Sequence, residues 1–194
     1  MIDFGTYARG LIKKSAKLGW AFILLTPPAL WGYFHYVMNL IVAAEQNSTG
    51  YKIIEAGRPE AALLPLREAV KLAPNQGDYH NNLGYALMLT GNLEESEREC
   101  RLAVILEPDH SWCQDSLGQI LTQRGKLVEA VKVCRYALQI APPEEESVYL
   151  NSLGRALYLS GEKANARHLW RRVTQSASNE KELHRAEGYL KKFR

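Results

Sequence analysis

Side chains that commonly do chemistry are present in this 194-residue chain, but their spacing predicts no site. No histidine is paired with a carboxylate or a cysteine at ligand spacing within one predicted helix, as a metal site would require; the histidines beyond residue 50 are His80, His110, His168 and His184. Asp109-His110 is expected in a loop rather than in a catalytic pair. Nucleophile-elbow, phosphate-loop and dinucleotide-binding motifs are absent from the sequence. We therefore predict a protein that is not an enzyme and holds no metal or cofactor.

The cysteines and the net charge exclude further classes. Cys100, Cys113 and Cys134 are odd in number and widely spaced, so the chain has neither a disulfide framework nor a C-x-x-C motif. The net charge of +3, from 24 basic and 21 acidic residues, is too small to predict nucleic-acid binding. Residues 155–194 hold ten basic and four acidic residues, which favours a charged partner or neighbour for this end of the chain.

A long uncharged segment, residues 18–44, predicts a membrane anchor. No residue in it carries a fixed charge, and a bilayer core of about 30 Å needs about 20 helical residues. Pro27-Pro28 predicts a kink in this transmembrane helix. The alternative is a secretory signal cleaved after Val42-Ala43-Ala44, but the segment exceeds the usual apolar region of about 7–15 residues in such signals. The interpretation as a retained, single-pass anchor is favoured.

The residues that flank the segment predict its orientation. Four basic residues lie in the preceding segment 1–17, which is expected to be a basic amphipathic stretch on anionic lipid: Arg9, Lys13, Lys14 and Lys17. The positive-inside rule then places the N-terminus in the cytoplasm and the rest of the chain on the far side, as in a bacterial inner membrane. Free cysteines weigh against an oxidising compartment. His35 is expected to make a helix–helix hydrogen bond, with a cofactor ligand as the alternative.

The rest of the chain is repetitive. Leu83-Gly84, Leu117-Gly118 and Leu153-Gly154 follow one another at intervals of 34 and 36 residues. Three further sets share this period: glycines 57, 91, 125 and 161; alanines 69, 103 and 137; prolines 74, 108 and 142. The pattern resembles the tetratricopeptide repeat family, with repeats near 43–76, 77–110, 111–146 and 147–180. It departs from the family at the aromatic position of the second helix, which holds Leu66, Cys100, Cys134 and Trp170.

The resemblance implies an all-α solenoid of about four helix-turn-helix repeats over residues 43–180, closed by a capping helix over residues 179–194. Gly84 and its equivalents are expected where the two helices of a repeat cross closely, and Gly91 and its equivalents where the first helix ends in a left-handed conformation. Cys100 and Cys134 are expected to be small core residues. Asn179 and Glu182 predict a capping box at the start of the last helix.

In this family the first helices of the repeats form a concave groove that binds protein partners. Transferred by register, the groove contains nine candidate binding residues: Asn81, Tyr85, Met88, Trp112, Asp115, Gln119, Asn151, Arg155 and Tyr158. The asparagines are expected to bond a peptide backbone, and the aromatic residues to be apolar anchors. Asp78, Trp112 and Asp115 break the family's clamp for acidic chaperone tails, so that function is not predicted.

The sequence thus predicts a membrane-anchored protein–protein interaction scaffold that helps to assemble or organise a membrane protein complex. Its expected partners are proteins in or at the membrane and the lipid bilayer, with no nucleic acid and no small-molecule substrate. The alternative is a permanent accessory subunit of a large respiratory, photosynthetic or secretion complex.

Overall fold

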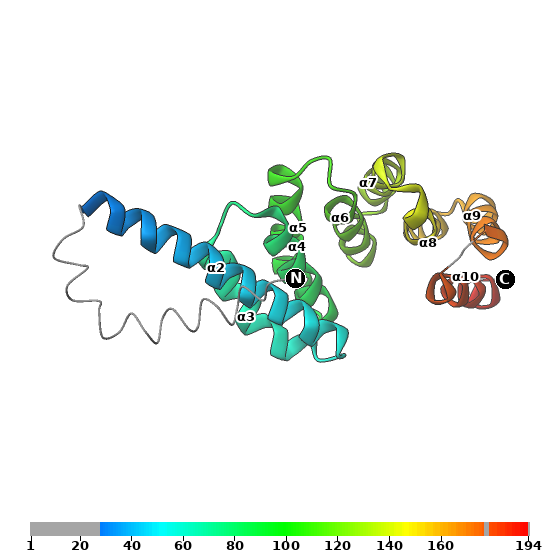
Figure 1. Ribbon diagram of the computed structural model, residues 1–194. Helices are drawn as coiled ribbons and strands as arrows, with labels where there is room; N and C mark the ends of the chain where they lie inside the picture. Colours follow the sequence, from blue (N-terminus) through cyan, green and yellow to red (C-terminus); the bar gives the residue numbers. More distant parts are fainter. Residues whose placement is uncertain (1–27, 177–178, 194) are drawn as a thin grey trace.

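The computed structural model describes residues 28–176 and 179–193, which form nine α-helices (Figure 1). A short 3₁₀ turn at Pro143–Glu145 precedes α8. Their order along the chain is α2 (Pro28–Glu55), α3 (Pro59–Leu72), α4 (Gly77–Leu89), α5 (Leu93–Leu106), α6 (Ser111–Gln123), α7 (Leu127–Ile140), α8 (Glu146–Leu159), α9 (Lys163–Ser176) and α10 (Glu180–Lys192). The predicted all-α class is confirmed.

The helices stack as consecutive hairpins in two layers. α2 packs on α3, α4 on α5, α6 on α7 and α8 on α9, and each second helix also contacts the first helix of the next pair. The first helices α2, α4, α6 and α8 contact one another in succession and form the inner layer. The second helices α3, α5, α7 and α9 form the outer layer. This arrangement is a tetratricopeptide-like solenoid.

Glycines allow the two helices of each hairpin to cross closely. A Cβ built on Gly84 would lie only 2.6 Å from Sγ of Cys100. The same clash would occur at three equivalent crossings, between Gly50 and Leu66, Gly118 and Cys134, and Gly154 and Trp170. The side chain in the family's aromatic position therefore fills the space above each glycine, and Cys100 and Cys134 are buried core residues as predicted.

The turn after each first helix also follows the sequence prediction. Gly57, Gly91, Gly125 and Gly161 have φ of 74°, 81°, 74° and 99°, which is the left-handed conformation that favours glycine.

Ion pairs from three arginines at equivalent positions link consecutive repeats along the outer layer. Three arginines in the same repeat position each pair with a glutamate of the next repeat: Arg67 with Glu95, Arg101 with Glu129 at 2.7 Å, and Arg135 with Glu162 at 3.8 Å. They lie on successive second helices, which make few other contacts with one another. Because these side chains are partly exposed, the pairs contribute more to the register of the repeats than to stability.

The helix α10 closes the solenoid against α8 and α9. Asn179 caps it, because its Oδ1 accepts a hydrogen bond from the backbone N–H of Lys181 at 3.0 Å. Glu182 is turned into the protein instead of completing the predicted capping box, and its carboxylate accepts hydrogen bonds from Asn151 and Arg185. The capping-box prediction therefore holds only for its asparagine.

The helix α2 has two different halves. From Ala43 onward it packs on α3, whereas its first turns expose large apolar side chains, each more than half exposed: Leu30, Trp31, Tyr33, Phe34 and Tyr36. Figure 1 shows this end, in dark blue, projecting away from the other helices. No helix within the described ranges has an apolar stretch long enough to cross a bilayer. Segment 1–17 and the anchor's first part, 18–27 with Pro27, lie outside the described residues.

Candidate functional site

The nine predicted binding residues all lie on the inner-layer helices α4, α6 and α8, but they differ in accessibility. Trp112 is exposed, and Tyr85, Gln119, Arg155 and Tyr158 are partly exposed. Four are buried: Asn81, Met88, Asp115 and Asn151. The register transferred from the family thus selects the correct layer, yet nearly half of the residues point into the protein rather than out of it.

Trp112 is the large side chain best placed to meet a partner. It lies in the first turn of α6 and is 42% exposed. Its ring packs edge-on against Tyr149, with 6.1 Å between the ring centroids. Tyr149 is itself fully buried and fixed by a 2.8 Å hydrogen bond from its hydroxyl to Oγ of Ser111. An exposed indole held on a rigid base is a typical anchor, because little side-chain entropy remains to be lost on binding.

Three of the buried residues form a polar row along the inner layer. Asn81, Asp115 and Asn151 occupy the same position in successive repeats and are each at most 8% exposed. The Nδ2 of Asn151 donates to the backbone oxygen of Glu182 at 3.0 Å and to its carboxylate at 2.8 Å. Asn151 is therefore occupied by α10 and is not open to a peptide backbone.

Asp115 is an ionisable group in the middle of this row. Burial raises its pKa to about 6, although hydrogen bonds from Gln119 and Ser152 act in the opposite direction. The Nε2 of Gln119 donates to Oδ2 of Asp115 at 2.6 Å, so these two predicted binding residues pair with each other. The row therefore serves internal packing.

The two tyrosines of the prediction are held by their neighbours. Tyr158 stacks on Phe193 with 4.3 Å between ring centroids and joins an aromatic cluster with Trp170 and Tyr189 at the end of the solenoid. Tyr85 packs against the core clusters of both halves of the domain. Tyr85, which was predicted as an apolar anchor in the groove, therefore takes part in the packing between repeats.

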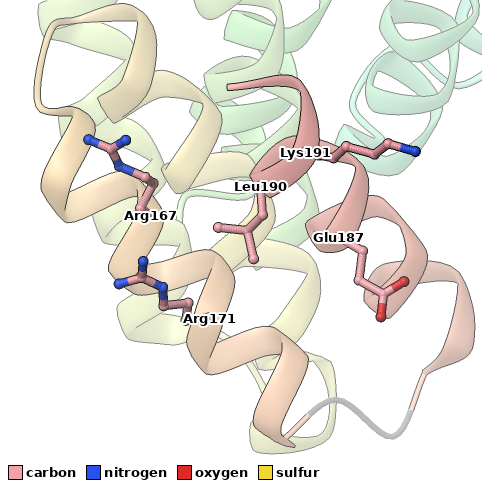
Figure 2. A pocket seen from close by; sticks show the side chains of 5 residues that line it. All are labelled: Arg167, Arg171, Glu187, Leu190 and Lys191. Carbon is pink, nitrogen blue, oxygen red and sulfur yellow. The ribbon is translucent and has the colours of Figure 1, made fainter. Parts of the chain in front are cut away.

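A second surface lies at the C-terminal end, where residues of α9 and α10 line a hollow of about 630 Å³. The hollow is lined by Arg167, Arg171, Glu187, Leu190 and Lys191; Figure 2 shows Leu190 of α10 pointing toward α9, which carries the two arginines, while Glu187 and Lys191 extend away from them. Three cations and one carboxylate give this surface a positive charge. It belongs to the basic tail noted in the sequence and suits an acidic group.

The histidines and cysteines of the repeats do not form a nucleophilic site. Cys113 lies 3.5 Å from Nδ1 of His110 but is fully buried. Burial, with the nearby carboxylates of Glu107 and Asp78, raises the pKa of its thiol to about 12. A thiol in that state is not an activated nucleophile. Asp109 accepts a hydrogen bond from Tyr136 at 2.7 Å, which gives this loop residue a structural contact.

Comparison with known proteins supports the repeat assignment. Residues 54–111 match the family model described as Tetratricopeptide repeat, and a search of curated proteins found no match. The chain is similar to the solved structure of Pseudomonas aeruginosa pilF, at 18% identity and a TM-score of 0.65, covering 80% of this chain and 74% of that one.

Two further solved structures show the same fold. The O-GlcNAc transferase of Thermobaculum terrenum is 19% identical over 71% of this chain, with a TM-score of 0.65, but this chain spans only 26% of that protein. The second tetratricopeptide domain of human RPAP3, in complex with an HSP70 peptide, is 21% identical with a TM-score of 0.54, covering 62% of this chain and 97% of that domain. At these identities the likeness shows the fold alone. The fold is typical of non-catalytic interaction scaffolds.

Proposed function

We propose that this protein is a membrane-anchored scaffold whose repeats capture a partner protein at a bilayer and help to assemble or organise a membrane protein complex. The observation that carries the proposal is Trp112, an exposed indole on the inner layer of the solenoid, fixed on the buried ring of Tyr149. A solvent-exposed tryptophan on a rigid support has no role in the core. Its exposed surface is best explained by contact with another protein.

Apolar side chains are also exposed on the neighbouring inner-layer helices, at the helix ends opposite to Trp112. Leu89 at the end of α4 and Leu159 at the end of α8 are both exposed. Around them, Gln123 is exposed and Arg155 is partly exposed, which provides polar groups for hydrogen bonds to a partner backbone. Protein interfaces usually combine apolar anchors with polar groups. The partner expected from this surface is an apolar peptide or helix, since the exposed carboxylate of Asp78 disfavours an acidic tail.

The N-terminal half of α2 supports the membrane part of the proposal. All residues from 30 to 36 are exposed, so the helix is open to its surroundings on every side there, and all of them but Gly32 and His35 carry large apolar side chains. A helix that is apolar all round is covered either by protein or by lipid. The residues from 18 onward continue the same uncharged segment. We infer that the bilayer covers this part and that α2 joins it directly to the first repeat.

The binding surface is tested by a pull-down from membranes with two variants. Trp112→Ala removes the proposed anchor, and Val128→Ala removes an 89% exposed apolar side chain from the outer-layer helix α7. Loss of a central anchor costs about 2 kcal/mol or more, which weakens binding about 30-fold. Both variants should melt near the wild-type temperature. Equal capture by the two variants would exclude Trp112 from the interface.

The anchor is tested by extraction of membranes at alkaline pH. The full chain should stay with the membrane pellet, and a chain that begins at residue 45 should be released. Release of the full chain at alkaline pH would contradict the anchor.

Solubilisation in mild detergent distinguishes the proposed function from its alternative. A permanent accessory subunit remains in stoichiometric amount with one large complex, whereas an assembly factor is substoichiometric.

A further inference from the structure

The junction between the second and third helical hairpins brings together four side chains of types that bind metal ions. Asp78 lies in the first turn of α4, Glu107 follows α5, His110 precedes α6, and Cys113 lies in the first turn of α6. One ligand atom from each of the four lies within 4.8 Å of the others. The imidazole of His110 lies between two of the others: its Nδ1 is 3.5 Å from Sγ of Cys113, and its Nε2 is 3.6 Å from Oδ1 of Asp78. One of the two ring nitrogens would bind an ion.

The repeats provide an internal comparison for this cluster. At the preceding junction the residues equivalent to Glu107, His110 and Cys113 are Ala73, Gln76 and Tyr79, and at the following junction they are Ala141, Glu146 and Tyr149. The solenoid therefore folds at the other junctions without a sulfur or an imidazole in these positions, and only Glu146 supplies a carboxylate there. A requirement of the repeat fold does not explain their joint presence at one junction.

A glycine at this junction leaves room for the side chain of Glu107. A Cβ on Gly77 would lie 2.8 Å from Cγ, Cδ and Oε1 of Glu107, so the glutamate side chain occupies the space that any other residue would fill. Oε1 of Glu107 also accepts a hydrogen bond from the backbone N–H of Asp78 at 3.2 Å. Glu107 is thus held over the start of α4, beside the carboxylate of Asp78, where two like charges would repel each other without a cation.

We propose that Asp78, Glu107, His110 and Cys113 form a metal site for Zn²⁺. Zinc is bound tetrahedrally by thiolate, imidazole and carboxylate ligands, whereas calcium and magnesium select oxygen ligands alone. Ligand atoms about 2.0–2.3 Å from a tetrahedral zinc ion are about 3.3–3.8 Å apart. The cluster is therefore close to the required geometry and contracts by about 1 Å. Asp78 is exposed and His110 is partly exposed, so their side chains can move and admit the ion.

Binding of the ion changes the protonation of the site and links two repeats. Cys113 coordinates as a thiolate, so its proton passes to solvent when the ion binds. Two carboxylates and one thiolate then surround a divalent cation, which removes the repulsion between Asp78 and Glu107. The ion joins the start of α4 to the start of α6, directly beside Trp112. It therefore acts as a structural clamp at the base of the proposed binding surface.

The test uses the purified full chain, stripped with a chelator and titrated with Co²⁺ as a spectroscopic probe and then with Zn²⁺. We expect one ion per chain, a thiolate-to-cobalt charge-transfer band, and displacement of Co²⁺ by Zn²⁺. Cys113→Ser should abolish the band, while Cys134→Ser, a change of the same kind at a buried cysteine on α7, should retain it. The absence of the band from the wild-type chain, or its persistence in Cys113→Ser, overturns the proposal.

A second pair of variants keeps the test valid if a cysteine variant fails to fold. His110→Gln introduces the residue that stands at the equivalent position 76, and His168→Gln changes an exposed histidine on α9. His110→Gln should weaken Zn²⁺ binding by at least about 10-fold and abolish the rise in melting temperature that Zn²⁺ causes in the wild-type chain. Equal Zn²⁺ affinity in the two variants would show that the ion binds elsewhere, and would also overturn the proposal.

Discussion

Replacement of Asp115 by asparagine should stabilise the protein above pH 6. Asp115 is 1% exposed, and its Oδ2 is bonded to the neutral amide of Gln119. Arg185, the cation whose charge acts on Asp115, is already paired with the carboxylate of Glu182 at 3.0 Å. The equivalent positions in the neighbouring repeats, 81 and 151, hold asparagine. An amide at position 115 would keep the hydrogen bond from Gln119 and remove a buried charge.

The size of the effect follows from the pKa. The carboxyl of Asp115 has a pKa of about 6 in the folded protein, against an ordinary value of 3.8. Because the folded pKa is raised, the stabilising contribution of the protonated carboxyl is complete below pH 3.8 and is lost as the pH rises through about 6. At 1.36 kcal/mol per pKa unit, the loss reaches about 3 kcal/mol above pH 6. Asp115→Asn should recover up to about that amount.

The assay is urea unfolding of the wild-type chain and the variant between pH 4 and pH 8, followed by circular dichroism. The two midpoints should coincide near pH 4, diverge through pH 6 and stay apart at higher pH, with an unchanged dependence on urea. A variant that is less stable than the wild-type chain at pH 8, or a difference that does not vary with pH, would refute the reasoning.

The reverse substitution at the equivalent position is the matched control. Asn151→Asp replaces an amide that donates to the carboxylate of Glu182 at 2.8 Å. It would place two buried carboxylates together and should therefore destabilise the domain at neutral pH. The pair of variants separates an effect of charge at this row from a general preference for one side-chain shape.

Three further predictions concern the core, a buried histidine and the anchor. Gly118→Ala should destabilise the domain by about 1–3 kcal/mol because the added Cβ clashes with Sγ of Cys134. Gly188→Ala, at an open position in α10, should instead stabilise the domain by up to about 1 kcal/mol. Thermal melts of both variants test this. His80 is buried, yet its hydrogen bonds to Glu99 and the backbone oxygen of Pro74 raise its pKa. The wild-type chain should therefore be more stable than His80→Gln by about 1.5–3 kcal/mol at low pH, and this difference in unfolding free energy should decline as the pH rises above 6.5. Urea unfolding at pH 5.5 and pH 8.5 measures it, and a constant difference would show that His80 is not charged in the folded protein. Residues 45–194 should form a soluble helical domain, because the inner and outer layers carry their own core; aggregation or loss of the circular dichroism signal would show that the domain needs the preceding segment.

The repeat register could be predicted from the sequence because its causes are local and periodic. Each helix crossing requires a glycine because the two helices approach closely. Each turn requires another because its backbone is in the left-handed conformation. Gly84 and Gly91 therefore recur with their equivalents at the same interval as the helices. The core role of Cys100 and Cys134 followed from the same register. The helix α2 is continuous from Pro28 to Glu55, and the sequence has no proline between Ala29 and Ala56.

The exposure of individual binding residues could not be predicted, because it depends on contacts between distant segments. Asn151 and Tyr158 have the register of groove residues, yet α10 covers both, and the sequence does not indicate how the last helix returns to α8. Glu182 has the spacing of a capping residue but lies buried against Asn151. The four residues of the proposed zinc site come from two repeats, so a search for ligands within one helix misses them.

The central claim, that the inner layer of the repeats holds a partner protein at the membrane, is tested most directly by photocrosslinking in intact membranes. A photoreactive amino acid is introduced at position 112 on the inner layer or at position 128 on the outer layer, since both side chains are exposed. We expect a discrete crosslinked protein from position 112 that is absent from position 128. Crosslinks from position 128 alone, or none from position 112 in membranes that contain the partner complex, would contradict it.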